Sequence, residues 1–203
     1  MKEIGDGMKY IYTEKDLDLI SWERVDNFTE KIYKDVKEYL NQNNLNIKYI
    51  IPIMRGGGVP AIMLSHMFDI IDILPLQLKY NYVENRIDEK INLEYVKNNN
   101  LKENECILLV EGNHVTGKTA NMAVDMIKQK FGNDVKIIYV SLTRDYTYKD
   151  SVKDVSYTTW AMTTNEMKEL SEEECKKLDI NYSLVSVYPW ENIQEELNAL
   201  NAD

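Results

Sequence analysis

The residues best suited to chemistry lie in the segment Thr116–Thr119, whose sequence is Thr-Gly-Lys-Thr. It follows the apolar run 107–110 and precedes apolar side chains that recur at helical spacing over 120–131. A strand, a short loop and a helix in this order bring free backbone N–H groups and the positive end of the helix dipole to one point. Together with two hydroxyl groups and one lysine, this arrangement predicts a site for a phosphate group.

A second glycine turn, Arg55–Gly58, has the same setting. It follows the apolar run 47–54, and a helical pattern resumes at Ala61. Backbone N–H groups in such a turn also suit an anion, whereas the plain alternative is a tight turn without a ligand. Ligands of open α/β sheets lie beyond the carboxyl ends of the strands. Both turns are therefore predicted to border the same cleft.

Strands and helices alternate through the middle of the chain, which predicts an α/β fold with a mostly parallel sheet and helices on both faces. The predicted strands are 9–12, 47–54, 73–80, 107–110, 135–142 and 182–188, and the predicted helices are 21–41, 61–67, 120–131, 166–178 and 191–200. Residues 1–203 are predicted to form a single domain. The charged segment 81–104 has no clear period and is predicted to be a long functional or mobile loop.

Composition argues against several classes of protein. The hydrophobic fraction is 44% and the charged fraction is 29%, as in ordinary globular chains. No run approaches the ~20 apolar residues of a membrane span, and the first ten residues lack the apolar core of a signal peptide, so we expect a cytoplasmic protein without a membrane partner. The net charge of -10 argues against a nucleic acid polymer as partner. Cys106 and Cys175 are expected to be buried thiols.

Residues Gly112–Thr119 read G-x-x-x-x-G-K-T, and two families have such a loop. The segment resembles the phosphate loop of P-loop NTPases, in which a later strand ends in an acid that holds Mg²⁺. Together with Glu111 it also resembles the phosphoribosyl pyrophosphate (PRPP) loop of type I phosphoribosyltransferases. The P-loop interpretation leaves Arg55–Gly58 without a role and finds no acid for Mg²⁺ at the end of strand 135–142. A nucleotide hydrolase therefore stays a minor alternative.

Other segments, from about Tyr10 to Glu191, resemble the xanthine-guanine branch of the phosphoribosyltransferases. They are the opening segment Tyr10–Thr13, the pyrophosphate loop Ile50–Pro60, the start of the mobile catalytic loop Leu78–Tyr80, and Tyr188–Glu191, which is similar to a Phe-Pro-Trp-Glu motif near the base. Their order is more specific than any single motif. The resemblance implies the type I phosphoribosyltransferase fold, with 81–104 as its mobile loop and a small hood region that includes about 155–191.

The resemblance also implies a role for each site residue. The phosphates would be bound by Arg55, Gly56, Gly57, Lys79, Thr116, Gly117, Lys118 and Thr119. The pocket for the base would comprise His114, Val115, Arg144, Trp160, Tyr188 and Trp190. Glu111 would be a catalytic residue and would also contact Mg²⁺, a cofactor expected only if the protein is an enzyme. Members of the family commonly form dimers, so a homodimer is compatible with the sequence.

The PRPP loop departs from the family pattern at two of its three acids. The second acid, which binds ribose hydroxyls, is replaced by Gly112, and the third, which exchanges a proton with the purine, is replaced by Val115. Loss of a general acid or base commonly lowers the rate ~10²- to 10⁴-fold. We therefore predict a protein that binds a nucleotide or phosphoribosyl ligand with little or no turnover, in sensing or sequestration. The alternative is an active, Mg²⁺-dependent purine-type phosphoribosyltransferase that uses PRPP.

Two further residues bear on these alternatives. Arg144 stands where purine-type enzymes have a lysine, and its planar guanidinium suits an oxyanion or a phosphate better than a single carbonyl. His114 could replace the lost proton carrier, whereas a solvent-exposed loop histidine is the plainer interpretation. The sequence leaves the ligand, the turnover and the oligomeric state open.

Overall fold

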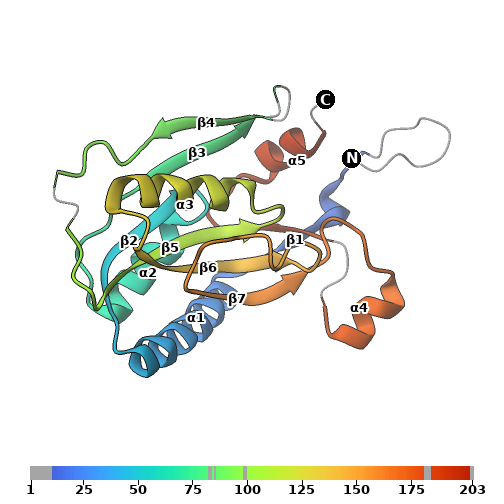
Figure 1. The fold of residues 1–203 in the computed structure, drawn as a ribbon. Helices are drawn as coiled ribbons and strands as arrows, with labels where there is room; N and C mark the ends of the chain where they lie inside the picture. The colour runs from blue at the N-terminus through green and yellow to red at the C-terminus, as the bar shows by residue number, and fades with distance from the viewer. Residues whose placement is uncertain (1–10, 82–83, 85, 98–99, 181–183, 202–203) are drawn as a thin grey trace.

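The computed structural model describes residues 11–81, 84, 86–97, 100–180 and 184–201. Its centre is a sheet of six strands in the order β4-β3-β2-β5-β6-β7 (Figure 1). The strands are β2 (Asn46–Met54), β3 (Leu76–Asn81), β4 (Arg86–Ile91), β5 (Glu105–His114), β6 (Lys136–Asp145) and β7 (Tyr157–Thr164). All neighbouring pairs are parallel except β3 and the edge strand β4. The predicted α/β fold with a mostly parallel sheet is confirmed.

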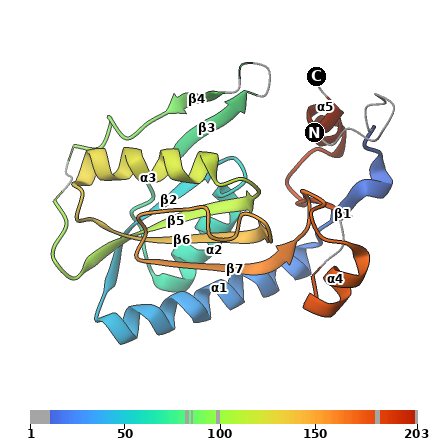
Figure 2. The same ribbon diagram turned by 45° about the vertical axis from the view of Figure 1, so that its right-hand side comes forward.

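Helices cover both faces of this sheet (Figure 2). They are α1 (Trp22–Asn43), α2 (Gly58–Phe68) and α3 (Lys118–Phe131). Leu108 and Val140 pack on the side of α1 and α2, whereas their neighbours Leu109 and Tyr139 pack on the side of α3. Successive residues of a strand point to opposite faces, so the central strands supply both cores. No helix in the described part of the chain is long and apolar enough to cross a membrane.

Helix α1 shows why the predicted amphipathic helix forms. Ser21 caps its N-terminus, where the hydroxyl accepts a hydrogen bond from Arg24 N at 3.2 Å. Val25 and Ile32 lie on the buried face, and the opposite face is charged. The helix ends at Asn43, slightly beyond the predicted end, because Asn44 adopts the left-handed conformation with φ 50°.

A smaller unit, the hood, lies beyond the carboxyl ends of the main strands (Figures 1 and 2). It comprises the 3₁₀ turn Glu14–Asp16, β1 (Leu17–Leu19), α4 (Glu172–Leu178), β8 (Val185–Val187) and α5 (Ile193–Asn201). Strands β1 and β8 pair in parallel, and Leu17, Val187 and Leu197 form a small core. The hood therefore contains residues from both ends of the described chain. Only part of the predicted hood segment 155–191 belongs to it.

Four segments differ from the sequence prediction. In the predicted strand 9–12, the described residues 11 and 12 are not part of a strand. Strand β4 occupies part of the predicted loop 81–104, and its polar sequence has no apolar period because this edge strand is largely exposed. Strand β7 was not predicted, because its threonine-rich sequence lacks a continuous apolar run. Helix α4 begins at Glu172 rather than at residue 166, since Ser171 and Glu174 form a capping box. Residues 9 and 10 of the predicted strand 9–12, and residues 182 and 183 of the predicted strand 182–188, lie outside the described residues. Both cysteines are buried free thiols, as predicted.

We expect Gly57→Ala to destabilise the turn that follows β2. A Cβ at Gly57 would lie 2.1 Å from the carbonyl oxygen of Val110, a backbone atom in the middle of the sheet. The free energy of unfolding should fall by roughly 1–3 kcal/mol, as measured by chemical denaturation. Gly58→Ala is the matched control, because its Cβ would meet only the flexible side chain of Met54. Equal losses in the two variants would contradict this backbone contact as the cause.

Candidate functional site

The predicted phosphate loop connects β5 to α3 at the carboxyl edge of the sheet (Figure 1). Gly117 has φ 73° and precedes the first helical residue, Lys118. A Cβ at Gly117 would lie 2.2 Å from Ser151 Oγ and 2.9 Å from His114 Cε1, so only glycine fits here. Asn121 Nδ2 donates to the carbonyl oxygens of Gly117 at 2.8 Å and Ser151 at 2.9 Å. The connection between β6 and β7 therefore supports the loop from behind.

The Arg55–Gly58 turn lies directly beside the end of β5. Strands β2 and β5 are parallel neighbours, and a Cβ at Gly112 would lie 2.9 Å from the carbonyl oxygen of Gly56. The Met54–Arg55 peptide at the start of this turn is cis. Both predicted anion turns are therefore neighbours at one edge of the sheet. The same contact leaves no room at Gly112 for the acid of the family pattern unless the turn moves.

A cavity of about 490 Å³ lies between the phosphate loop and the hood. Its loop side consists of Glu111, Asn113, Val115, Thr116, Gly117, Lys118 and Thr119. Its hood side consists of Tyr12, Glu166, Met167, Val185, Ser186, Glu191, Glu196 and Leu200. A volume in this range suits a small organic molecule. The cavity thus brings together six of the predicted site residues, which are Glu111, Val115, Thr116, Gly117, Lys118 and Thr119.

The two sides of the cavity have opposite polarity. Around Thr116–Thr119 the loop side presents hydroxyl groups, the N-terminus of α3 and Lys118, which all suit an anion, whereas the Glu111 carboxyl group on the same side does not. The hood side presents carboxyl groups. Burial raises the pKa of Glu166 to about 7, although hydrogen bonds from Asn113 and Ser186 act in the opposite direction. Burial also raises the pKa of Glu191 to about 7.

Glu111 belongs to a buried hydrogen-bond network rather than projecting freely. The Tyr139 hydroxyl lies between the Glu111 carboxyl group, to which it donates, and His114 Nδ1, at 2.8 Å. Burial raises the pKa of Glu111 to about 7 and lowers the pKa of His114 to about 4. His114 Nε2 lies 3.0 Å from the Tyr148 carbonyl oxygen, which can only accept, so this nitrogen carries a proton. The interpretation of His114 as a solvent-exposed loop histidine was wrong, because its side chain is buried.

Arg144 and Trp160, both predicted for the base pocket, pack against each other elsewhere. The guanidinium carbon of Arg144 lies 4.6 Å from the Trp160 ring centroid and 5.4 Å from that of Tyr139. Arg144 is fully buried, and its Nη1 donates to Thr158 Oγ1 at 3.2 Å. Burial lowers the pKa of Arg144. Neither Arg144 nor Trp160 is among the described residues that line the cavity.

Tyr188 and Trp190 are stacked, with ring centroids 4.9 Å apart and an interplanar angle of 4°. The Tyr188 hydroxyl donates to the carbonyl oxygen of Gly112 at 2.9 Å and lies 2.7 Å from Thr143 Oγ1. Both rings pack with the core on the α1 and α2 side. They tie the hood to the end of β5, and the described cavity lining does not include them.

The other predicted phosphate contacts lie at or beyond the rim. Arg55 is exposed, and its Nη2 lies 3.5 Å from Glu195 Oε2 on α5. Burial raises the pKa of Glu191 and Glu196, two carboxyl groups of the cavity, and the charge of Arg55 opposes this rise. Lys79 is exposed in β3, where it pairs with Asp88 of β4 in the strand register. The structure thus places Arg55 beside the cavity and Lys79 on the edge hairpin.

The described residues include no group of three or more His, Cys, Asp or Glu side chains arranged to hold a metal ion. Strand β6 extends to Asp145, beyond its predicted end, and this acid could have matched the P-loop pattern. Its carboxyl oxygens instead accept hydrogen bonds from the backbone of Thr147 at 2.9 Å and Met167 at 3.0 Å. Asp145 is fully buried, so it stabilises the turns that follow β6 and β7.

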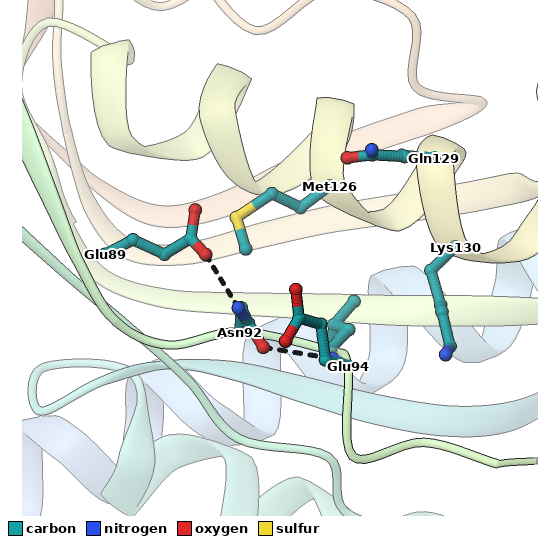
Figure 3. A pocket seen from close by; sticks show the side chains of 7 residues that line it. Glu89, Asn92, Glu94, Met126, Gln129 and Lys130 are labelled. Atoms are coloured by element: carbon teal, nitrogen blue, oxygen red, sulfur yellow. Dashed lines mark hydrogen bonds between the residues drawn. The ribbon is translucent and has the colours of Figure 1, made fainter.

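A separate depression lies between β4 and α3 (Figure 3). Its polar groups bind one another: Asn92 Nδ2 donates to Glu89 Oε1 at 2.8 Å, and Asn92 Oδ1 accepts from Glu94 N at 3.0 Å. Because these groups are mutually satisfied and lie away from both glycine turns, we do not assign a site there.

Sequence reasoning missed the hood side of the cavity. Glu166 and Met167 were placed in a predicted helix, although the Ser171-x-x-Glu174 capping box signals a later start. Val185 and Ser186 lie in the predicted strand 182–188, but the motif there drew attention to Tyr188 and Trp190 instead. Glu196, on α5, had no local signal, since its place in the cavity depends on how the hood packs.

Neither the family models nor the curated proteins that were compared match this sequence. Solved structures do match it. The purine phosphoribosyltransferase from Pyrococcus horikoshii has a TM-score of 0.60 at 21% identity, over 88% of this chain and 95% of its own. The xanthine-guanine-hypoxanthine phosphoribosyltransferase of Helicobacter pylori has a TM-score of 0.55 at 14% identity, over 89% and 97%. A Neisseria gonorrhoeae protein with bound ppGpp has a TM-score of 0.53 at 16% identity, over 89% and 93%.

These likenesses define the class of fold. The chain has the type I phosphoribosyltransferase fold, which confirms the prediction from the sequence motifs. The solved structures that share this fold include two purine-type phosphoribosyltransferases. The roles assigned to individual site residues stay predictions.

Glu166→Gln should change how stability depends on pH. Burial raises the pKa of Glu166 from 4.5 to about 7, so the folded protein holds this proton more tightly than the unfolded chain. The resulting stabilisation is complete below about pH 4.5 and is lost as the pH rises through 7. Between these limits, the free energy of unfolding of the wild type should fall by roughly 3 kcal/mol relative to the variant.

Denaturant unfolding at a series of pH values measures this difference. Glu169→Gln, on the exposed turn nearby, controls for the loss of a carboxyl group. Parallel pH curves for the wild type and Glu166→Gln would show that Glu166 titrates alike in the folded and unfolded states.

Proposed function

We propose that this protein binds a nucleotide or phosphoribosyl ligand with little or no turnover, in a sensing or sequestering role. The observation that carries the proposal is a cavity with a complete phosphate loop but without two acids of the family pattern. The Gly56 backbone occupies the space that a side chain at position 112 would need, and the Val115 side chain adds only apolar surface to the cavity. Neither residue can bind ribose hydroxyls or carry a proton. The site therefore favours binding over catalysis.

The proposed ligand class is a purine nucleotide. The Neisseria neighbour binds ppGpp, and two other neighbours are named for purine transfer. In this chain, Thr116–Thr119 would hold a phosphate through backbone N–H groups, hydroxyls and Lys118. Val115, Met167 and Val185 provide apolar surface for a ring. Arg55, whose guanidinium lies 3.5 Å from Glu195 Oε2, would contact a further phosphate group.

An active purine-type phosphoribosyltransferase is the second candidate. Glu166 and Glu191 favour it, because cavity carboxyl groups whose pKa lies near neutrality are suited to proton transfer. Mg²⁺ would then be held by the phosphates of PRPP and by Glu111, the cavity carboxylate of the PRPP loop, and would neutralise charge on the pyrophosphate. A P-loop hydrolase is not supported, since the fold is that of the phosphoribosyltransferases and Asp145 is engaged by backbone groups.

A turnover assay separates the two candidates. The protein is incubated with PRPP, Mg²⁺ and a panel of purine and pyrimidine bases, and pyrophosphate release is followed. We expect no release at an enzyme-like rate of about 1 s⁻¹ or more, and an intact nucleotide in mass spectra of the purified protein. Sustained release with any base would overturn the binding proposal and establish the transferase.

Lys118→Ala should weaken binding of a purine nucleotide. A saturating nucleotide at about 100 times its Kd stabilises the folded state by about 2.7 kcal/mol, which for a chain of this size raises the Tm by roughly 5–10 °C. Loss of a charged contact to phosphate should lower the affinity by roughly 10- to 100-fold and remove about half of that shift at the lower limit and most of it at the upper limit. Lys34→Ala, on the exposed face of α1, is the control. An undiminished shift in Lys118→Ala would exclude the loop as the phosphate site.

A further inference from the structure

The hood side of the cavity contains a fixed acceptor group that phosphate binding does not explain. Glu166 is only 8% exposed, and both of its carboxyl oxygens accept from Asn113 Nδ2 at 3.0 Å. Oε1 also lies 3.3 Å from the donor Ser186 N. Asn113 is itself oriented, because its Oδ1 accepts from Thr143 Oγ1 at 3.0 Å. A chain of hydrogen bonds from β6 thus holds the carboxyl group of Glu166 in place before a ligand binds.

The Ser186 hydroxyl lines the same cavity and has unused hydrogen-bonding capacity. Ser186 is 6% exposed, and its Oγ has no hydrogen-bond partner among the described residues. The same hydroxyl lies near the Glu166 carboxyl group and acts to lower the pKa of that group, against the larger effect of burial. Buried hydroxyl groups in folded proteins nearly always have a partner. A polar atom of a ligand is therefore expected beside Ser186 and Glu166.

The chemistry of these groups restricts that ligand. An ionised carboxyl group only accepts hydrogen bonds, so Glu166 requires donors, whereas the Ser186 hydroxyl can donate to a neighbouring acceptor. Val115, Met167 and Val185 supply apolar surface in the same cavity, which suits a flat ring better than a hydrated ion. A 2-amino-6-oxopurine presents two adjacent N–H donors next to a carbonyl oxygen. A 6-oxopurine without the amino group presents only one such donor.

We propose that Glu166, held by Asn113 and flanked by Ser186, selects nucleotides whose base presents adjacent N–H donors, as a 2-amino-6-oxopurine does. This inference rests on the proposed function, since the phosphate loop and the acceptor group lie in one cavity and would bind opposite ends of the same molecule. Glu166 acts as a specificity-determining residue, independently of whether the base is transferred.

The test compares GMP with IMP, which differ only in the 2-amino group. Their dissociation constants are measured by calorimetry on the full chain at pH 8, where Glu166 is ionised. We expect GMP to bind roughly 10- to 100-fold more tightly than IMP. In Glu166→Gln this ratio should approach 1, and XMP should gain affinity relative to GMP because the amide can donate to its 2-oxo group. Glu169→Gln, on the exposed turn nearby, should keep the wild-type ratio.

Each outcome has a distinct meaning. Equal binding of GMP and IMP by the wild type would overturn the role of Glu166 and leave the proposed function intact. This comparison uses the wild-type protein alone, so it does not depend on whether a variant folds. Tighter binding of O-phosphoethanolamine than of GMP would assign the carboxyl groups to a cation and would also overturn it. Absence of binding by any of these phosphate esters would instead contradict the proposed function.

Discussion

The structure depends on one close contact between backbones, where the turn after β2 meets β5. Gly57 and Gly112 have no side chains there, and the carbonyl oxygens of Val110 and Gly56 occupy the space that a Cβ would need. Because of this contact, the two glycine turns lie side by side at the carboxyl edge of the sheet. The same contact explains the absence of an acid at Gly112. The geometry that brings the turns together therefore also leaves no room for an acidic side chain at position 112.

The cavity derives its character from the two units that enclose it. The main sheet contributes the loop that we propose as the phosphate site, whose conformation is fixed by Gly117, Asn121 and Ser151. The hood contributes carboxyl groups, and burial keeps the pKa of Glu166 and Glu191 near neutrality. A ligand that joins a phosphate to a donor-rich group would match both sides at once. The opposite polarity of the two sides thus favours a molecule with two different ends over inorganic phosphate alone.

The fold could be predicted largely from sequence because its main signals are local. Apolar runs, glycine turns and helical periods identified the β2–α2 and β5–α3 units that carry both anion turns. Strand β4 escaped prediction because an exposed edge strand needs no apolar face, and β7 escaped because threonine-rich strands lack an apolar run. Motif comparison placed Arg144, Tyr188 and Trp190 in a base pocket. In the structure these side chains turn toward Trp160, Gly112 and the core, a matter of side-chain direction that spacing along the chain does not report.

The sequence by itself determined the segment Thr116–Thr119 that is predicted to bind phosphate, the second glycine turn, and the Gly112 and Val115 positions where the resembled family has acids, because each depends on a few consecutive residues. Only the tertiary structure decided which groups face that loop. Tyr12, Glu166, Ser186 and Glu196 come from separate elements of the hood and meet only when the two ends of the chain pack together. Burial, which raises the pKa of Glu166 to about 7, is likewise a property of the packed molecule. Residue types therefore specified one half of the cavity, and packing of distant segments specified the other.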